Sequence, residues 1–380
     1  MNDRLRERIE TPLVERQREG LLRSVAPYCC SDAEINLADN DYWSLSQHPE
    51  VREAAQEAIR KHGCSASASP LITGFGEAHQ ALLQRLKQWC GFEHGVLWNS
   101  GYAANHAVLS LLPERGDLVL ADRLIHNSMV RGILDSNARL VRYRHLDLDH
   151  LESLLIEHQA RAGVTFVVTE SVFSMDGDYP DLRRMAGLKD RFDFVWIVDE
   201  AHAIGWYGAR GSGLVEETRV AGRVDVLVGT LGKGLGSQGA YTLFHNERIA
   251  QFLVNYAPEF IYSTYLAPAA AAAAEKSIDL FESGRLDRAA ARDQSRRFRE
   301  RLREVGLGVP GGDSPIVPIL LSDPELADQA RDNLRRAGVN AALVRPPTVP
   351  EGTTRLRISL KGDLDAEVLD RVVAALRGLP

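Results

Sequence analysis

The sequence has little cysteine and little lysine, and it lacks long apolar runs. Only four of its 380 residues are cysteine, and they form no Cys-x-x-Cys pair. No two histidines have the spacing of a zinc site, so we expect reduced, mostly buried thiols and neither disulfides nor a bound metal. No stretch reaches the roughly 18 apolar residues that a membrane-spanning helix requires. The cysteines are Cys29, Cys30, Cys64 and Cys90.

The net charge of the chain limits which classes of partner it is expected to bind. The formal net charge is −7 and charged residues make up 26% of the chain, so a general affinity for nucleic acid or an anionic membrane is not expected. The first eight residues are charged and have no apolar core, unlike a signal peptide. We therefore expect a cytoplasmic protein.

Short apolar runs alternate with helical stretches over the middle of the chain. Most of these runs are β-branched and continuous, which is typical of parallel strands buried on both faces. The alternation predicts an open, doubly wound α/β sheet of seven strands, with ligands at the carboxyl ends of the strands. The seven runs are 96–98, 118–121, 140–143, 164–169, 194–198, 224–228 and 240–244.

The pattern divides the chain into three parts. Residues 1–45 are expected to form a helix over 1–24 and an arm, because Ile9, Leu13 and Leu21 follow a helical period. Residues 46–267 carry the predicted sheet as a large domain. Residues 268–380 combine helices with shorter strands and are expected to form a small α+β domain.

One lysine differs from the rest in its context. Lys233 lies in Gly-Thr-Leu-Gly-Lys-Gly-Leu-Gly, directly after the run at 224–228, and the flanking glycines allow the backbone to approach a ligand closely. A Walker A phosphate loop is excluded, because Leu227 stands where its first glycine belongs and Gly234 replaces its hydroxyl residue. The other five lysines lie in helical or surface-like contexts, where a solvated charge is the ordinary role.

A buried acid ends another apolar run, in Val-Asp-Glu-Ala-His at 198–202. Such an acid is costly unless it is paired. One interpretation is a helicase-type box that binds Mg²⁺ and ATP, which would need the missing Walker A motif. The other is a partner for the ring nitrogen of pyridoxal phosphate (PLP), which keeps the ring protonated as an electron sink. The order Asp199, His202, Lys233 favours the second.

Four further motifs are each weak in isolation. Asn99–Asn105 would open a helix with small residues and suits a phosphate. His126 and the segment 169–177 follow strand ends, although a lone histidine more often has a structural role. Arg345 precedes a proline-rich turn, and its planar guanidinium suits a carboxylate, although a surface arginine is the simpler interpretation.

Taken together and in this order, the motifs resemble the α-oxoamine synthases, PLP enzymes of the aspartate aminotransferase fold. The resemblance runs from about residue 9 to the C-terminus. It implies the type I fold of PLP-dependent transferases, with a mostly parallel seven-stranded sheet and a smaller α+β C-terminal domain. The most specific matches are 169–178, 198–202, 230–236, 261–264 and 345–357.

The resemblance assigns roles at the cofactor. Lys233 would hold PLP as a Schiff base and act as the catalytic base, and Asp199 would bond the pyridine nitrogen. His202 and Ser174 would support the phenolic oxygen, and His126 would stack on the ring. The residues implied at the phosphate are Ser100, Gly101, Tyr102 and Thr230, with Ser263 and Thr264 reaching the cofactor of the other subunit in a homodimer that shares its active sites.

The resemblance also implies a substrate site and a reaction. Arg345 would grip the amino-acid carboxylate, and the residues expected to line the site are Arg23, Asn40 and Thr348. The motif at 345–357 points to the branch that condenses L-alanine with a pimeloyl thioester of CoA or acyl carrier protein. The products would be 8-amino-7-oxononanoate, CO₂ and the free thiol, in biotin synthesis.

Alternatives remain open at this point. A related α-oxoamine synthase would use glycine or serine and another acyl-CoA, as 2-amino-3-ketobutyrate CoA ligase does. A catalytically silent PLP-fold protein is opposed by the intact Lys233, Asp199 and His202. A helicase-like ATPase is opposed by the missing Walker A motif and the acidic charge.

Three segments depart from the family pattern. The run Ser65–Pro70 replaces a glycine-rich run, Trp43 and Ser44 replace Leu-Gly, and Ser171 replaces a glycine. Trp43 and the loop at 65–73 are expected near the acyl entrance, where they would alter which thioester fits.

Overall fold

The computed structural model describes residues 1–23, 25, 27, 35–158, 163–321, 323–346 and 348–379. Cys29 and Cys30 lie outside the described residues. Within them, Cys64 is exposed, Cys90 is buried, and both are free thiols. No helix in this described part is long and apolar enough to cross a membrane.

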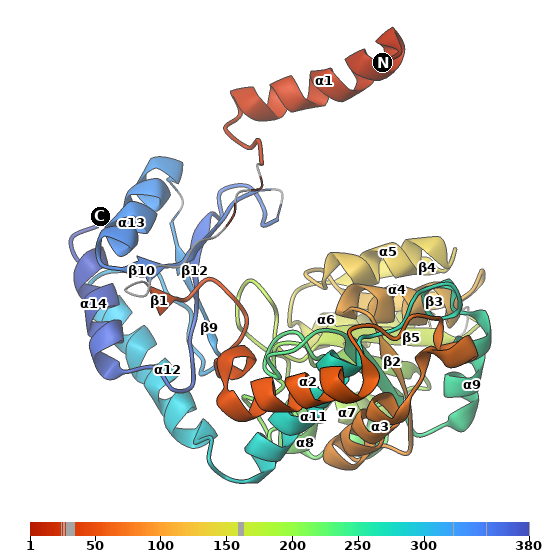
Figure 1. Cartoon of the computed structure of the whole chain (residues 1–380). Helices are drawn as coiled ribbons and strands as arrows, with labels where there is room; N and C mark the ends of the chain where they lie inside the picture. The colour runs from red at the N-terminus through yellow and green to blue at the C-terminus, as the bar shows by residue number, and fades with distance from the viewer. Residues whose placement is uncertain are drawn as a thin grey trace.

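A seven-stranded sheet forms the centre of the larger unit (Figure 1). The strands lie in the order β2-β8-β7-β6-β5-β3-β4, and β8 alone runs antiparallel to its neighbours. The seven predicted strands are confirmed, with ends shifted by at most two residues. They are β2 (His94–Trp98), β3 (Leu118–Asp122), β4 (Arg139–Tyr143), β5 (Thr165–Glu170), β6 (Val195–Asp199), β7 (Val226–Thr230) and β8 (Ala240–Phe244).

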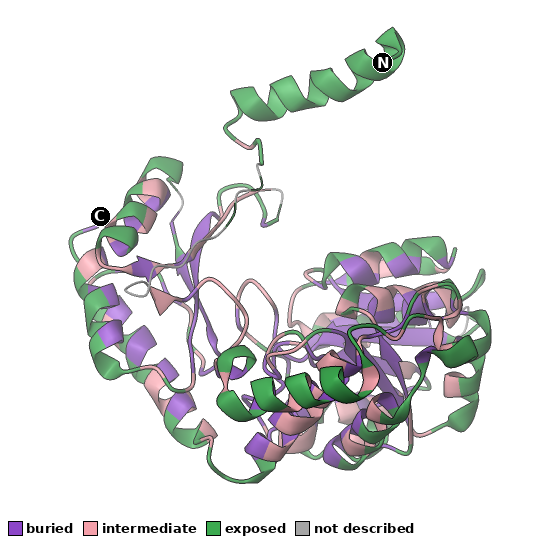
Figure 2. Cartoon of the chain, viewed as in Figure 1, coloured by how far each residue is buried: buried purple, intermediate pink, exposed green. Residues whose placement is uncertain are grey.

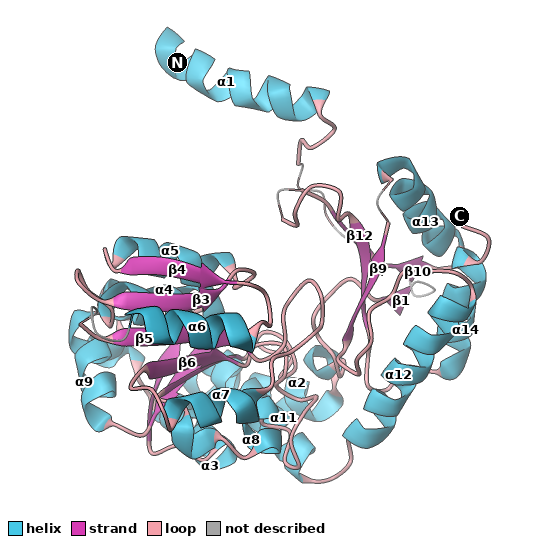
Figure 3. Ribbon diagram, turned by 180° about the vertical axis from the view of Figure 1, so that it is seen from behind, coloured by secondary structure: helices cyan, strands magenta, loops and turns pink. Residues whose placement is uncertain are grey.

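Helices cover both faces of this sheet, which buries its middle strands completely (Figures 2 and 3). This explains why the strands read as continuous apolar runs. Helix α2 (Pro49–His62) begins at a proline and is capped at its C-terminus by Gly63, where φ is +80°. The helices are α2 (Pro49–His62), α3 (Glu77–Cys90), α4 (Gly101–Leu111), α5 (Asn127–Asp135), α6 (Leu148–His158), α7 (Leu182–Lys189), α8 (Leu214–Thr218), α9 (Glu247–Tyr256), α10 (Pro258–Ile261) and α11 (Pro268–Glu282).

The directions of the strands place the loops that carry the candidate site residues at one edge of the sheet. Strand β2 is antiparallel to β8, and β8 is antiparallel to β7, so β2 points the same way as β7. The carboxyl ends of β2, β3, β4, β5, β6 and β7 therefore lie along one edge of the sheet. The segments that begin at Asn99, Arg123, Ser171, Glu200 and Leu231 leave from this edge.

The smaller unit is built on a three-stranded antiparallel sheet in the order β11-β12-β9. Its strands are β9 (Ile316–Leu320), β11 (Ala342–Val344) and β12 (Arg355–Ser359), and its helices are α12 (Arg288–Glu304), α13 (Pro324–Arg336) and α14 (Ala366–Leu376). The N-terminal arm joins this unit, because β1 (Ile35–Asn36) pairs with β10 (Val339–Asn340).

The boundary between the units follows the packing of the helices. Helix α11 packs against α2 and α3 of the larger unit, and the chain turns at Gly284, where φ is +74°, before α12 begins. By these contacts, α11 packs with the larger unit. The predicted division of the chain into domains at residue 268 stays a prediction.

Helix α1 (Asp3–Arg18) stands away from both units (Figure 1). None of its residues is buried, and it exposes Leu5, Ile9 and Leu13 on successive turns. A helix was expected over 1–24, but it ends at Arg18, so Leu21 lies beyond it.

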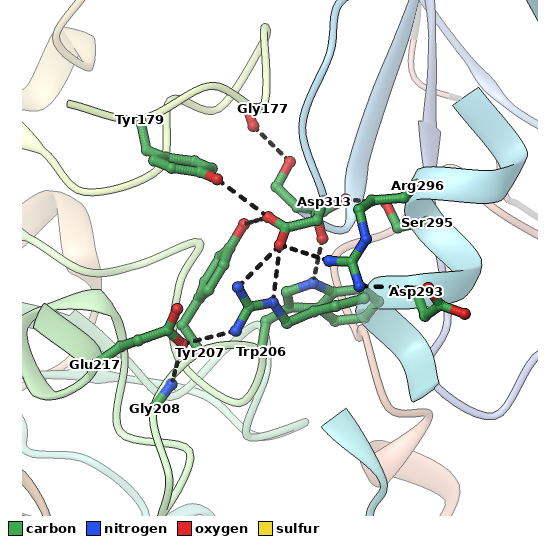
Figure 4. Close-up of polar contacts among 12 residues, drawn as sticks. Gly177, Tyr179, Trp206, Tyr207, Gly208, Glu217, Asp293, Ser295, Arg296 and Asp313 are labelled. Atoms are coloured by element: carbon green, nitrogen blue, oxygen red, sulfur yellow. Dashed lines mark hydrogen bonds and ion pairs between the residues drawn. The ribbon is translucent and has the colours of Figure 1, made fainter. Parts of the chain in front are cut away.

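A buried carboxylate joins the two units (Figure 4). Asp313, just before β9, accepts hydrogen bonds from Tyr207 at 2.8 Å and Tyr179 at 3.3 Å in the larger unit. Arg292 and Arg296 of α12 reach it at 2.9 Å and 3.1 Å. Burial alone would raise the pKa of Asp313, but the bond from Tyr207 and the charge of Arg292 lower it overall.

We predict that Asp313→Asn destabilises the protein by about 1.5–3 kcal/mol, the range for a hydrogen bond to a charged group. The neutral amide keeps the shape but leaves the two arginines without their shared anion. Thermal unfolding should show a lower midpoint temperature. Asp293→Asn is the matched control, because its pairs with Arg296 and Arg297 are exposed and worth about 0–1 kcal/mol. Equal midpoints for the two variants would contradict the role of Asp313.

Candidate active site

Lys233 lies in the turn after β7, and its side chain meets His202. The distance from Lys233 Nζ to His202 Nε2 is 2.7 Å, and the Oη of Tyr42 lies 2.6 Å from the other ring nitrogen. Burial lowers the pKa of Lys233 to about 8, although Asp199 and Glu170 oppose the shift. Burial and the charge of Lys233 hold the pKa of His202 well below its usual value. The site therefore contains a neutral imidazole beside an amine that gives up its proton near neutral pH.

Asp199 ends β6 and is 5% exposed. Its carboxylate accepts hydrogen bonds from the Asn105 amide at 2.7 Å and from the backbone N–H of Ala201 at 2.8 Å. The same Asn105 amide bonds to Ser128 Oγ at 3.2 Å, which lies 2.7 Å from Nδ1 of His126. A polar chain thus connects Asp199 with His126, the N-cap residue of α5.

A second acid lies beside Asp199. Glu170 ends β5 and is paired in register with Asp199 of β6, so the two carboxyl groups share one face of the sheet. Burial, reinforced by the negative charge of Asp199, raises the pKa of Glu170 well above its usual value. Burial beside another acid therefore favours the protonated form of Glu170.

The start of α4 and the end of β7 form an open cradle of backbone. Ser100 caps α4 by accepting from the N–H of Ala103 at 3.1 Å, and Gly101 and Tyr102 begin the helix. The first N–H groups of a helix have no partner within it and favour anions. A Cβ added to Gly101 would lie 3.8 Å from the Thr230 side chain, so these residues are neighbours.

Ser263 and Thr264 lie at the surface next to this cradle. The Asn99 amide donates to the Thr264 carbonyl oxygen at 2.8 Å. Tyr262, which precedes them, is 83% exposed. The structure therefore places this pair near the site and leaves their surroundings open to solvent.

The smaller unit contributes an arginine that the motif analysis had not singled out. Arg357 of β12 is 4% exposed and donates to the Ser174 carbonyl oxygen at 2.7 Å and to Asn40 Oδ1 at 2.9 Å. It also lies 3.5 Å from the Tyr42 hydroxyl, which contacts His202. Arg357 is thus linked to Lys233 through two side chains.

The remaining expected substrate residues lie in a separate pocket. Arg23 donates to Thr348 Oγ1 at 3.0 Å, and both line a cavity of about 370 Å³ together with Met175 and Arg345. The guanidinium of Arg345 is bound to Asp328 of α13. The structure therefore brings Arg23, Thr348 and Arg345 to one cavity and pairs Arg345 with Asp328, not with any residue of the group around Arg357.

Three contributing residues were missed by sequence reasoning. Asn105 and Arg357 stood inside the quoted motifs, but no local signal shows that they reach Asp199 and Asn40. Tyr42 follows Asn40 in an Asp-Asn-Asp-Tyr segment, and its partner His202 is 160 positions away. Trp43 is a core residue, 4% exposed, whose indole N–H donates to the Gly205 carbonyl oxygen at 2.7 Å, and its expected place near the acyl entrance stays a prediction.

The residues present fit pyridoxal phosphate. Asp199 retains room to accept from a ring N–H, and the buried Oδ1 of Asn105 has no hydrogen-bond partner. The start of α4 offers N–H groups for a phosphate beside Thr230, and Lys233 offers an amine of lowered pKa for an aldehyde. These groups meet at one edge of the sheet, as a single cofactor requires.

Comparison with known proteins agrees with this geometry. Residues 32–376 match the family model of class I and II aminotransferases. The 8-amino-7-oxononanoate synthase of Geobacter sulfurreducens is 42% identical over 344 residues, which cover 90% of this chain and 88% of that protein.

Two solved structures are also similar over most of their length. The serine palmitoyltransferase of Sphingomonas wittichii has a TM-score of 0.90 at 28% identity, covering 97% of this chain and 96% of that chain. The 8-amino-7-oxononanoate synthase of Francisella tularensis has a TM-score of 0.78 at 27% identity, covering 91% and 98%. The ATPase interpretation of the Asp-Glu-Ala-His segment is therefore wrong, and the chain belongs to the α-oxoamine synthases, PLP-dependent acyltransferases within the class I and II aminotransferase family.

Proposed function

We propose that this enzyme condenses L-alanine with a pimeloyl thioester and releases CO₂ and the free thiol to give 8-amino-7-oxononanoate. The observation that carries the proposal is the pair of Lys233 and His202 at 2.7 Å, with the amine at a pKa of about 8 and the Asp199 carboxylate nearby. The names of the curated relatives support the choice of acyl and amino substrates.

The positions of the side chains support a set of cofactor contacts. Lys233 would attach the cofactor through its amine, Asp199 would accept from the pyridine nitrogen, and His202 would support the phenolic oxygen. Ser174 would assist His202, and His126 would lie against the ring. The residues for the phosphate are Ser100, Gly101, Tyr102 and Thr230.

The protein's own groups then move protons and hold charge. Bound pyridoxal phosphate supplies an electron sink for the bonds at Cα of an amino acid. Asp199 would accept a hydrogen bond from the ring nitrogen and so hold its proton. The amine of Lys233 would accept the Cα proton of the amino acid, because an amine with a pKa near the working pH is an efficient base. Neutral His202 adds no competing positive charge beside it.

We infer that the amino-acid carboxylate binds Arg357 and Asn40 rather than Arg345. Arg357 is buried and linked through Tyr42 and His202 to Lys233, so a carboxylate there would lie near the reacting atoms. Arg345 already has a carboxylate partner in Asp328. Arg23 and Thr348 would line the acyl side of the site in their common pocket.

We further propose a homodimer in which Ser263 and Thr264 reach the phosphate of the other subunit's cofactor. Support comes from exposed apolar side chains near them, because contiguous exposed apolar surface marks interfaces. Tyr262 is 83% exposed and Ile72 is 76% exposed, and the loop of Ile72 is tied to this region by the hydrogen bond of Tyr265 N to Ala68 O. A cytoplasmic location stays a prediction from composition.

A second candidate reaction keeps the chemistry and changes the substrates. The serine palmitoyltransferase with a TM-score of 0.90 supports a synthase that uses serine, or glycine, with another acyl thioester. The two candidates share Lys233, Asp199 and His202, so only substrates distinguish them.

The first test is release of free thiol from pimeloyl-CoA by the PLP-loaded protein. We expect release with L-alanine, little with glycine or L-serine, and loss of release in Lys233→Ala and Asp199→Asn. Removing the base or the ring partner should lower the rate by about 100-fold or more. Release with serine or glycine in place of alanine would move the enzyme to the second candidate, and near-normal turnover of Asp199→Asn would contradict the site.

A second test compares the two arginines by conservative replacement. Lysine keeps the charge but cannot form the two-pronged bond to a carboxylate. We predict that Arg357→Lys lowers kcat/KM for alanine by about 10- to 100-fold, from the roughly 1.5–3 kcal/mol of a charged hydrogen bond. Arg345→Lys, the matched variant, should change it by less than about threefold. A larger loss of kcat/KM in Arg345→Lys than in Arg357→Lys would assign the substrate carboxylate to Arg345.

A further inference from the structure

The segment Phe173–Asp178 forms a tight loop after β5 that carries Ser174. The N–H of Phe173 donates to the Asp178 carbonyl oxygen, and the N–H of Gly177 donates to the Phe173 carbonyl oxygen, each at 2.9 Å. The smaller unit holds one side of this loop, because Arg357 bonds the Ser174 carbonyl at 2.7 Å and Ser314 Oγ bonds the Gly177 carbonyl at 2.5 Å.

A histidine from the larger unit holds the other side. His145 follows β4, and its ring lies between two carboxylates. Nδ1 is 2.8 Å from Asp122 at the end of β3, and Nε2 is 3.0 Å from Asp178 in the loop. The edge of the ring also contacts Phe173, with centroids 4.5 Å apart and planes at 88°. Asp122 is itself fixed by the backbone N–H groups of Leu124 and Leu146, at 2.9 Å and 2.8 Å.

This arrangement determines the charge of His145. Both ring nitrogens face carboxylate oxygens, so both must donate, and only the imidazolium form has two donors. Burial alone would lower the pKa of His145, but Asp122 and Asp178 raise it to about 9. Tyr143 is a further ionisable neighbour, paired in register with Asp122, and it stays neutral because burial raises its pKa.

We propose that His145 is a positioning residue of the cofactor site: as an imidazolium it ties the Phe173–Asp178 loop to β3 and so holds Ser174 where the cofactor binds. We call the pairing of His145 with Asp122 and Asp178 the clamp. The role of Ser174 rests on the proposed function, whereas the clamp rests on the contacts of His145. Without His145, the loop keeps its attachments to the smaller unit and its covalent link to β5, and it loses the side-chain tie to Asp122 at the end of β3.

The clamp has a defined pH dependence. A group whose pKa is raised by folding stabilises the folded form below its unfolded value, about 6.5 for histidine. That contribution is lost as the pH rises through the folded value, here about 9. The loop should therefore be ordered at neutral pH and loosen above about pH 9.

Hydrogen exchange of the PLP-loaded enzyme tests this directly. We expect His145→Gln to speed exchange of the peptide that spans 171–179 by about 10- to 100-fold at pH 7, from the roughly 1.5–3 kcal/mol of a charged hydrogen bond. In the wild type, the exchange rate of this peptide should rise by the same factor between about pH 8 and 10, after correction for intrinsic rates. In His145→Gln, the corrected exchange rate should not rise further over this pH range. Affinity for pyridoxal phosphate should fall in parallel.

The controls separate the clamp from stability and from the proposed reaction. His245→Gln is matched, because His245 also bonds a carboxylate, Glu93, but lies after β8 at the opposite edge of the sheet. It should leave the 171–179 peptide unchanged. If His145→Gln does not fold, Asp178→Asn removes one of the two anions and should give the same local increase. Unchanged exchange in a folded variant would overturn the clamp, whereas altered exchange without thiol release in the wild type would overturn only the proposed function.

Discussion

The site depends on a single buried negative charge, the Asp199 carboxylate at the end of β6. A charge at this depth is stable only when donors surround it, and here Asn105 and the N–H of Ala201 provide them. Burial and the charge of Asp199 raise the pKa of its neighbour Glu170 well above its usual value. The opposing amine of Lys233 has a lowered pKa for the same reason, since both lie where water is largely excluded. Burial thus lowers the pKa of Lys233 and of His202, and it raises the pKa of Glu170.

The smaller unit completes the site. Its strand β12 contributes Arg357, which reaches Asn40 and the loop of Ser174, and Arg355, which is bound to Asp176 of the same loop. Asp313 also joins the two units, through Tyr207 and Arg292. Both units therefore hold the loop that carries Ser174.

Much of the fold was predictable, because its signals are local. Continuous apolar runs identified the seven strands, and the parallel directions then gathered the motifs that follow them at one edge. Helix α1 ended before its predicted limit, and the packing of α11 against α2 and α3 depends on contacts that local periodicity does not reveal.

The site was predictable only in part. Lys233, Asp199 and His202 stood out because each lies in a motif next to a strand end. Arg345 and Arg357 both lie in the motif at 345–357, and nothing in the local sequence shows which of them could bind a substrate carboxylate. The distinction comes from the partners that folding gives them, Asp328 for one and Asn40 for the other. Trp43 shows the same limit, because its place in the core is fixed by contacts with distant segments.

The central claim is that Lys233, among six lysines, is the amine that carries the cofactor. The direct measurement is reduction of the PLP-loaded protein with borohydride, followed by digestion and mass spectrometry of the peptides. Reduction makes the bond between the lysine and the cofactor permanent, so the mass of the modified peptide identifies the lysine. This account predicts the phosphopyridoxyl group on the peptide that contains Lys233. The same group on any other lysine, or on none, would contradict it.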